Sequence, residues 1–458
     1  MTAPSAAPRI AVVGGGLLGM TLAHRLRGEQ PNASITVFES APRAGGLASA
    51  WTVGTVTWDR FYHVTLASDS ATRRLLRELD LEDEVSWETT RTGCWADGRI
   101  TPLGTPVEFL RSPVLGPLGK ARLAMTIGRG STTRRWQRLE DTPVADWLTR
   151  WSGRATFRRF WLPLLRSKLG DGWSRSNAAF IWATIQRLSA ARRAGLGDER
   201  FGYVRGKDGQ PGGYARTLEA LGGLLAREDI DLRCNAKVES VERDGSSTAG
   251  ALTVRTADGV ETFDDVVVTV APPVAAKLCP ALNDTERDAL AAIPYQGVVC
   301  TSLVLRRPLA GYYLTYLVDD VPITTVIEMS SLVDPVEYAG HTLVYIPQYV
   351  SSDAPILDST DEEIAEAARR GLQAVHPGVT NDDIVATRTA RARYVFPLPV
   401  LGYSRTVPSI ETSVPGLHLV CSAQIVNGTL NANETITLAD TAAPKVAGAL
   451  HSSGVRVR

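Results

Sequence analysis

Three glycines and one acid near the N-terminus have the spacing of a dinucleotide-binding turn. Gly14-x-Gly16-x-x-Gly19 follows an apolar run that ends at Val13, and Glu39 ends the next apolar run, 20 residues after Gly19. In such a unit the glycines permit a sharp turn, a close approach of the backbone to a pyrophosphate, and close packing of a helix. The free N–H groups of that helix attract phosphates, and the acid binds ribose hydroxyls. The pattern therefore predicts a strand–turn–helix–strand unit for a dinucleotide.

A second glycine pair follows the acid, in the segment Arg43-Ala-Gly45-Gly46-Leu47. With Glu39, this pair makes the chain resemble the large family of FAD-dependent amine oxidases, protoporphyrinogen oxidases and phytoene desaturases. In that family a basic residue and a glycine pair follow the ribose acid. A nicotinamide dinucleotide does not need the second loop, whereas the ribityl chain and ring of a flavin must run onward past the first turn. The sequence therefore favours FAD, held noncovalently because no flavin-linking motif is recognised.

The resemblance covers nearly the whole chain. It matches Gly212-Gly213, before a helix, to the glycine pair that follows the family's helical insert, and it implies that Val238 holds the adenine through its backbone. The C-terminal strand and helix match the segment that closes over the pyrimidine end of the flavin. Many members have Gly-Asp or Gly-Glu after that strand, but this chain has Cys421-Ser422. The role of the family's acid is therefore open here, and the serine hydroxyl could donate in its place.

The resemblance also implies a turn of small residues at the N-terminus of the last helix, where this chain has Asn431-Ala-Asn433-Glu434-Thr435. Asn and Thr cap helices, and N–H groups at such a helix start can stabilise negative charge on a reduced flavin. A simple helix cap is the alternative. The residues that we expect to contact the cofactor are Gly14, Gly16, Leu17, Leu18, Gly19, Glu39, Ser40, Arg43, Gly45, Gly46, Leu47, Val238, Ser422, Asn433, Glu434 and Thr435.

An aromatic block with one histidine, Trp58-Asp59-Arg60-Phe61-Tyr62-His63, comes shortly after the second glycine pair. This block and the segment 160–170 resemble a subgroup of bacterial proteins similar to protoporphyrinogen oxidase. Tyr62 and His63 are the candidate catalytic residues, because they should lie near the flavin, where His63 could carry a proton or hydrogen-bond a substrate. The alternative is that both residues only pack and hydrogen-bond the loop over the cofactor.

Positive charge gathers in one segment of a chain that is neutral as a whole. The chain has 49 Lys and Arg against 49 Asp and Glu, yet residues 111–207 hold 20 basic and 6 acidic residues. Such a segment beside a flavin would concentrate an anionic substrate, or it could touch an anionic membrane with help from apolar stretches in residues 102–127. A merely solvated face is the alternative. The candidate substrate-binding residues are Arg60, Arg166 and Lys168, and the last two could instead be surface charges.

The elements that position these residues come from separate parts of the chain. The resemblance implies an α/β fold with a Rossmann-like FAD-binding domain of the glutathione-reductase type, discontinuous over residues 1–66, 206–275 and 405–458. An α+β substrate domain with a helical insert would comprise residues 67–205 and 276–404. From its sequence pattern, segment 67–205 is expected to be mainly helical.

Length and composition are typical of a globular protein with two domains. A chain of 458 residues exceeds one ordinary core, and 44% of the residues are hydrophobic. Five scattered cysteines predict free thiols in a reducing cytoplasm, without a disulfide framework. No apolar run of 18 residues, signal-peptide pattern or metal-binding motif is recognised. We therefore expect no transmembrane segment and no metal. The neutral net charge gives no indication of a nucleic-acid partner. We expect either a monomer or a homodimer.

The resemblance implies an FAD-dependent oxidoreductase, in which flavin N5 takes a hydride from a small metabolite. An amine, an amino or nucleotide sugar, or a natural-product intermediate would serve as substrate, with an anionic molecule favoured and O2 as the final acceptor. Two alternatives stay open. One is a redox-neutral flavoenzyme resembling UDP-galactopyranose mutase, and the other is a non-catalytic FAD-binding protein.

Overall fold

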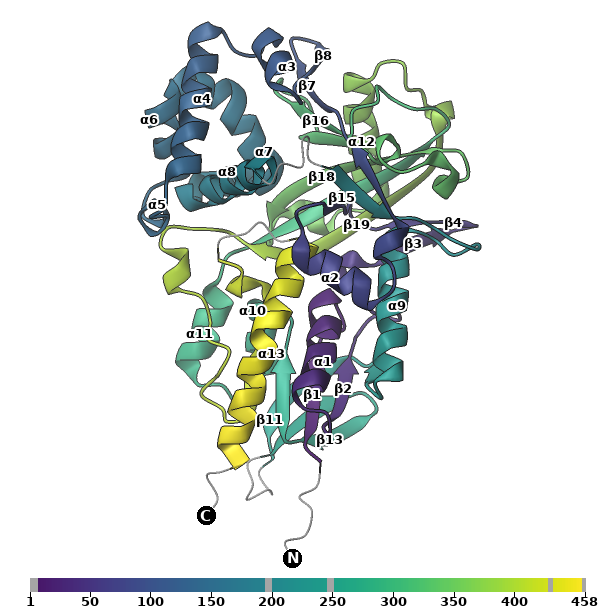
Figure 1. Cartoon of the computed structure of the whole chain (residues 1–458), viewed down its shortest axis with the longest axis vertical. Helices are drawn as coiled ribbons and strands as arrows, with labels where there is room; N and C mark the ends of the chain where they lie inside the picture. The colour runs from purple at the N-terminus through teal and green to yellow at the C-terminus, as the bar shows by residue number, and fades with distance from the viewer. Residues whose placement is uncertain (1–6, 194–199, 245–250, 427–430, 455–458) are drawn as a thin grey trace, which may run out of the picture.

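The computed structural model describes residues 7–193, 200–244, 251–426 and 431–454, and Figure 1 shows how they are arranged. A parallel sheet and its helices lie at the end of the molecule that carries both chain termini. A second, larger sheet and a group of helices lie at the opposite end. The sequence also predicts a turn of glycine and asparagine that begins at Asn427, and residues 427–430 lie outside the described residues.

The parallel sheet draws its five strands from three distant segments of the chain. Its strands run in the order β10–β2–β1–β14–β20, with every neighbouring pair parallel. Successive residues of a strand face opposite sides, and both sides of β1 are apolar, with Ile10 and Val12 on one face and Ala11 and Val13 on the other. The sheet is therefore buried between two layers. Its strands are β1 (Arg9–Val13), β2 (Ser34–Phe38), β10 (Asp231–Arg233), β14 (Asp265–Val268) and β20 (Leu417–Leu419).

Different elements cover the two faces of this sheet. The face with Ile10 and Val12 packs against helices α1 (Leu17–Glu29), α2 (Ser70–Glu78), α9 (Gly213–Arg227) and α13 (Ala432–Gly454). The face with Ala11 and Val13 packs against a three-stranded antiparallel sheet and two short helices. These are β11 (Val238–Arg243), β12 (Leu252–Thr256), β13 (Gly259–Phe263), α10 (Pro272–Leu278) and α11 (Asp284–Ala292). The three layers are those of the predicted α/β fold.

The second sheet has seven strands in the order β19–β15–β18–β17–β16–β7–β8. Helix α12 (Asp361–Val375) packs on one face through residues such as Leu372, which meets Leu303 and Val344 in one apolar cluster. The other face is rich in aromatic side chains and meets the hairpin of β3 (Ala50–Val53) and β4 (Val56–Asp59). The strands are β7 (Thr92–Ala96), β8 (Arg99–Pro102), β15 (Tyr295–Leu305), β16 (Leu314–Leu317), β17 (Thr325–Glu328), β18 (Thr342–Ser351) and β19 (Ile384–Pro397).

A separate group of helices packs around its own apolar core beside the large sheet (Figure 1). We call this group the helical insert. It comprises α3 (Pro106–Arg111), α4 (Pro117–Thr132), α5 (Gln137–Glu140), α6 (Val144–Thr156), a π-helical turn (Phe157–Trp161), α7 (Leu162–Leu169) and α8 (Ala178–Arg193). No helix of the described residues is long and apolar enough to cross a membrane.

The expectation that residues 67–205 are mainly helical is confirmed, although the segment also contributes strands that were not expected. Two of its strands, β7 and β8, extend the large sheet, and β9 (Arg200–Val204) pairs with β6 (Val85–Thr89) and with β5 (Thr65–Leu66), which begins just before this segment. Asp97 and Gly98, between β7 and β8, both have positive φ, as a two-residue hairpin turn requires. The Asp-Gly pair therefore indicates a hairpin in the sequence, within a segment whose overall pattern favours helices.

Candidate active site

The first glycine turn packs backbone against backbone. Gly14 has a φ of +114°, and a Cβ atom on Gly19 would lie 1.9 Å from the carbonyl O of Gly14. The Gly15 N–H donates to Oε2 of Glu39 at 2.9 Å. Residue Gly16 precedes α1, whose first turn has no acidic residue and no side-chain cap. The N–H groups at the start of α1 are therefore left for an anion, as a pyrophosphate site requires.

The second glycine turn lies directly on the first one. The N–H of Gly45 donates to the carbonyl O of Gly15 at 2.8 Å, and a Cβ atom on Gly46 would come within 3.2 Å of the Cα of Gly16. Both Gly45 and Gly46 have positive φ. Only glycines allow the two turns to approach this closely, so a single continuous backbone surface is formed.

The expected adenosine residues meet at the end of β2. The backbone of Glu39 donates to Arg233 O and accepts from Ala236 N, both at 2.8 Å. Its carboxylate also accepts the N–H of Ala41 at 2.7 Å, and the Ser40 hydroxyl lies 3.2 Å from it. Val238, at the start of β11, is buried two residues after this contact. The carboxylate is thus held in place by backbone donors beside the segment that leads to Val238.

The remaining cofactor candidates differ in how they are engaged. Leu17 is buried and Leu18 is packed against the core below α1, whereas Arg43 is exposed and Leu47 is half-buried. Ser422 lies in a short 3-10 turn after β20, with its hydroxyl 3.0 Å from that of Tyr295 at the start of β15. Ser422 therefore connects the parallel sheet to the large sheet.

The start of α13 is capped from within and also caps a neighbour. The Asn431 side chain accepts the N–H of Glu434 at 3.0 Å, and the hydroxyl of Thr435 donates to Asn431 O. Asn433 instead accepts the N–H groups of Ala71 and Thr72, at 2.9 and 3.3 Å, at the start of α2. The Asn433 side chain is therefore committed to joining α2 and α13, which leaves the backbone of this turn as the group that could face a flavin.

These features fit a flavin dinucleotide. The two glycine turns form a cradle that side chains would block, an uncapped helix start faces it, and a fixed carboxylate lies at the end of β2. This combination suits a pyrophosphate flanked by a ribose and a ribityl chain. Within the described ranges, no group of three or more His, Cys, Asp or Glu side chains could hold a metal ion.

Tyr62 and Lys168 lie together in the structure. The ammonium group of Lys168 donates to the Tyr62 hydroxyl at 3.2 Å and lies 5.6 Å from the centre of its ring. The Tyr62 hydroxyl is 3.3 Å from that of Tyr349 on β18. Burial raises the pKa of Tyr62, Tyr349 and Tyr316. The positive charge of Lys168 offsets only part of this rise for Tyr349 and Tyr316. The cluster is therefore a half-buried lysine surrounded by neutral hydroxyls, which can bind an anion or a polar substrate group.

The other two substrate candidates have different surroundings. Arg166 is exposed, two residues before Lys168 on α7. Arg60 stacks its guanidinium 4.5 Å from the centre of the Trp51 ring, and burial lowers its pKa. Only Lys168 among the three is in contact with a candidate catalytic side chain.

His63 faces away from this cluster. Its ring lies 5.1 Å from that of Tyr214 on α9, and burial lowers the pKa of His63 to about 4. Its Nδ1 atom is buried without a hydrogen-bond partner among the described residues. The imidazole is therefore neutral at pH 7 and has one nitrogen available to a ligand.

Asp59 has a role that sequence reasoning did not assign. Its carboxyl accepts the N–H of Tyr214 at 3.2 Å at the start of α9, and its backbone O accepts the Tyr345 hydroxyl at 2.7 Å. Burial raises the pKa of Asp59 to about 8. Gly213 belongs to this contact, because a Cβ atom there would lie 3.2 Å from Oδ1 of Asp59. The glycine pair before α9 could have suggested a closely approaching partner, but not which one.

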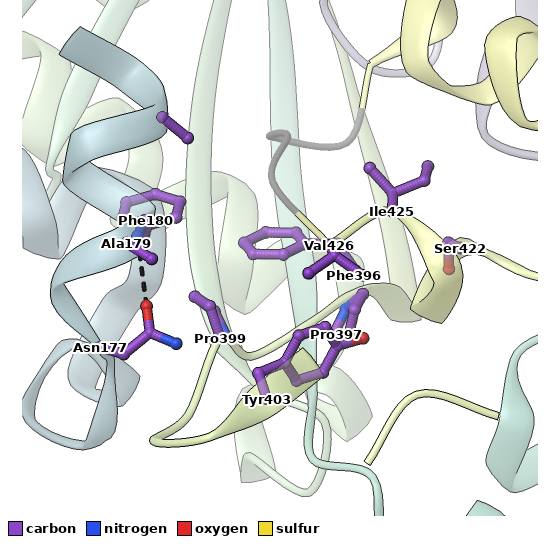
Figure 2. Close-up of a pocket in the computed structure, with 11 residues that line it drawn as sticks. Asn177, Ala179, Phe180, Phe396, Pro397, Pro399, Tyr403, Ser422, Ile425 and Val426 are labelled. Carbon is purple, nitrogen blue, oxygen red and sulfur yellow. Dashed lines mark hydrogen bonds between the residues drawn. The ribbon is translucent and has the colours of Figure 1, made fainter. Parts of the chain in front are cut away.

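A pocket lies beside Ser422, between the helical insert and the end of β19 (Figure 2). Aromatic rings form much of its wall, and the Phe180 N–H donates to Oδ1 of Asn177 at 3.2 Å at the start of α8. No sequence pattern indicated this pocket, because its walls come from three distant segments. The main lining residues are Asn177, Phe180, Phe396, Tyr403, Ser422 and Ile425.

Comparison with known proteins gives a family and several structural relatives. A family model described as flavin-containing amine oxidoreductase matches residues 19–431. The coproporphyrinogen III oxidase of Staphylococcus aureus is 24% identical over 256 residues, which cover 51% of this chain and 54% of that protein. The chain thus spans about half the length of the relatives it matches.

Two solved structures share the fold over almost their whole length. One is a candidate protoporphyrinogen oxidase from Exiguobacterium sp. 255-15, with a TM-score of 0.77, 17% identity, and coverage of 97% of this chain and 99% of the other. Another is reduced UDP-galactopyranose mutase, with a TM-score of 0.71, 15% identity and coverage of 98% of each chain. At these identities the likeness confirms the predicted fold.

The glycine cradle yields a direct test within one helix. Gly19→Ala should weaken FAD binding by at least about tenfold, because the new methyl group would collide with the backbone of Gly14. Gly28→Ala is the matched control on α1, where a Cβ atom meets nothing within 4 Å; it should bind FAD normally and gain roughly 1 kcal/mol of stability. The measurements are bound FAD per chain and the melting temperature. Normal flavin content in both variants would refute the cradle.

Acid stability should depend on His63. Its folded pKa of about 4 lies below the ordinary 6.5, so the unfolded chain binds a proton that the folded chain excludes. The wild type should lose about 1.4 kcal/mol of unfolding free energy per pH unit from this residue as the pH falls from about 6.5 to about 4, and nothing above that window. His63→Gln should flatten that dependence in urea unfolding at several pH values. Parallel curves for the two proteins would show that the imidazole is accessible to protons.

Proposed function

Because the chain belongs to the family of flavin-containing amine oxidoreductases, we propose that it is an FAD-dependent oxidoreductase acting on a small anionic metabolite. The observation that carries this proposal is the backbone contact between the two glycine turns, which leaves a cradle suited to the pyrophosphate and ribityl chain of FAD. The FAD is held noncovalently, and O2 is the final electron acceptor. When bound, the flavin supplies a two-electron acceptor for a hydride.

A short path of contacts joins Ser422, one of the expected cofactor residues, to the Lys168 cluster. Ser422, at the cofactor side, contacts the Tyr295 hydroxyl, and the neighbouring Gln296 side chain donates to the carbonyl O of Leu169 at 2.7 Å. Leu169 directly follows Lys168 on α7. This path supports a substrate site between the flavin ring and the large sheet, in which Lys168 would bind the anionic group.

Each polar group of this site has a separate task. The Lys168 ammonium binds a carboxylate or phosphate, and the Tyr62 and Tyr349 hydroxyls fix its direction by hydrogen bonds. The surrounding aromatic side chains exclude water, which strengthens these interactions. On the other side of the chain, His63 stays neutral and serves to pack and hydrogen-bond the loop, because a pKa of about 4 makes it a weak base at pH 7. Orientation and dehydration are thus the contributions of the protein.

Anaerobic reduction tests the proposed activity. The purified protein should be yellow, and one of two anionic probes should bleach it without oxygen: coproporphyrinogen III or an amino sugar phosphate. Readmitted O2 should restore the colour with formation of hydrogen peroxide, and acid precipitation should release the flavin. A flavin that dithionite reduces but none of a wide set of anionic or amine metabolites reduces would contradict the proposal. A flavin that even dithionite leaves oxidised would favour a purely structural cofactor.

A redox-neutral nucleotide-sugar mutase is the second candidate, and the basic charge of residues 111–207 favours it. Photoreduced protein would then be mixed with UDP-galactopyranose without oxygen. Ring-contracted product without net oxidation of the flavin would support this candidate over the oxidoreductase.

The anion-binding role of Lys168 can be separated from the general charge of the insert. Lys168→Met should raise KM for an anionic substrate by about tenfold or more, since a charged hydrogen bond is lost, and should leave KM for an uncharged analogue unchanged. Arg166→Met is the matched control, because it removes an exposed charge from the same helix; its KM should change less than about threefold. Equal effects of the two substitutions would assign binding to the overall field.

A further inference from the structure

Large apolar side chains are exposed mainly at one place in the molecule. Among the described residues, nine such side chains are exposed, and five of them lie on α3 and α4. Their exposed fractions run from 39% to 67%. Scattered single residues of this kind are ordinary, whereas a group marks an interaction surface. The five residues are Val107, Leu110, Leu118, Met125 and Ile127.

The two helices present these residues as one surface. The Lys120 ammonium donates to the carbonyl O of Leu110 at 2.6 Å, which holds the end of α3 against the first turn of α4. On α4, Leu118 and Met125 are two helical turns apart and therefore share a face. Arg122 and Arg129 each follow one of them by four residues, and both are exposed. Apolar and basic side chains thus alternate along one exposed side of α4, next to α6, where the guanidinium of Arg129 lies 5.3 Å from the centre of the Trp151 ring.

The opposite side of α4 is fixed in the core of the helical insert. Leu123, Thr126 and Gly130 are buried. The Gln186 side chain on α8 donates to Gly130 O at 2.9 Å, and the Trp182 indole donates to Thr133 O at 2.9 Å. Helix α4 is therefore held firmly in the insert, and its exposed face cannot turn toward the core. In Figure 1, α3 and α4 lie on the outside of the insert, away from the parallel sheet.

The charge of this segment selects the kind of partner. Residues 103–138 contain seven basic residues and one acid, Glu108, and Glu108 is engaged in capping α3 together with Thr105. A protein partner with an acidic groove would need a matching apolar anchor pocket, and a polyanion would leave the leucines in water. An anionic phospholipid surface satisfies both, since its headgroups attract arginine and its acyl region accepts short apolar side chains.

We propose that α3 and α4 form a docking surface for an anionic phospholipid bilayer, with Leu110, Leu118 and Met125 entering the interface and Arg111, Arg122 and Arg129 contacting the headgroups. The protein lies on the bilayer and does not span it. Because α4 is bonded to α8, which lines the pocket of Figure 2, the docking surface and that pocket are both built on the helical insert.

Vesicle sedimentation with the full chain tests this surface. Binding to phosphatidylcholine vesicles with about 30% phosphatidylglycerol should exceed binding to pure phosphatidylcholine by about tenfold or more, and about 0.5 M salt should weaken it. The triple variant Leu110→Ser, Leu118→Ser, Met125→Ser should lose at least about tenfold in affinity for anionic vesicles. So should the triple variant Arg111→Gln, Arg122→Gln, Arg129→Gln, which keeps the apolar residues.

The matched control changes exposed apolar residues outside the insert, Val336→Ser, Val385→Ser and Leu401→Ser, and should bind within about twofold of the wild type. Melting temperature and flavin content show whether each variant is folded. If the apolar variant does not fold, vesicle binding by the arginine variant decides the test. Equal binding to both kinds of vesicle, or to neither, overturns the proposal. A dimer in light scattering that the apolar variant dissociates would assign the surface to a second copy. Binding to heparin that ignores the apolar substitutions, without vesicle binding, would assign it to a polyanion.

Discussion

The structure depends on two glycine turns, 14–19 and 45–46, whose backbones pack closely within the first turn and against each other. Gly19 lies against the carbonyl of Gly14, and Gly46 lies against Gly16. This contact fixes the start of α1 relative to the second turn, so the path of the cofactor is set by the backbone and needs no adjustable side chain. The outer elements, including α9 through Leu218 at Gly45, pack around this fixed point.

Asp59 connects the cofactor-binding part of the molecule to the large sheet. Its carboxyl holds the start of α9, while its backbone O holds Tyr345 of the large sheet. The chain then leaves β4 through Tyr62 and His63, whose side chains point to opposite surroundings, one toward Lys168 and one toward Tyr214. Adjacent residues of an extended chain face opposite ways, so a single short segment can serve both the cofactor half and the substrate half.

Local glycine patterns, and the family resemblance that rests on them, carried most of the prediction of the fold. The glycine spacing and Glu39 identified the first unit because each residue has a backbone task that sequence spacing encodes. Tyr349 and Tyr316 were not predicted, since they reach Lys168 only through the pairing of β18, β17 and β16. The strand β19 was also missed, because its run of alternating arginine, threonine and alanine lacks the apolar pattern of a buried strand. Pairing with β15 decides its conformation instead.

The position of Lys168 follows from the same packing. A Cβ atom on Gly170 would lie 2.2 Å from the carbonyl O of Tyr349, so the end of α7 touches β18 without an intervening side chain. That contact brings the lysine among hydroxyls that stay neutral, because burial raises the pKa of Tyr62 and Tyr349. Among the described residues, the half-buried Lys168 ammonium forms no ion pair with a carboxylate, and taking an unpaired charge partly out of water is costly. An anionic substrate would supply a counter-charge, which gives the cluster a preference for anions that the exposed arginines of the insert cannot provide.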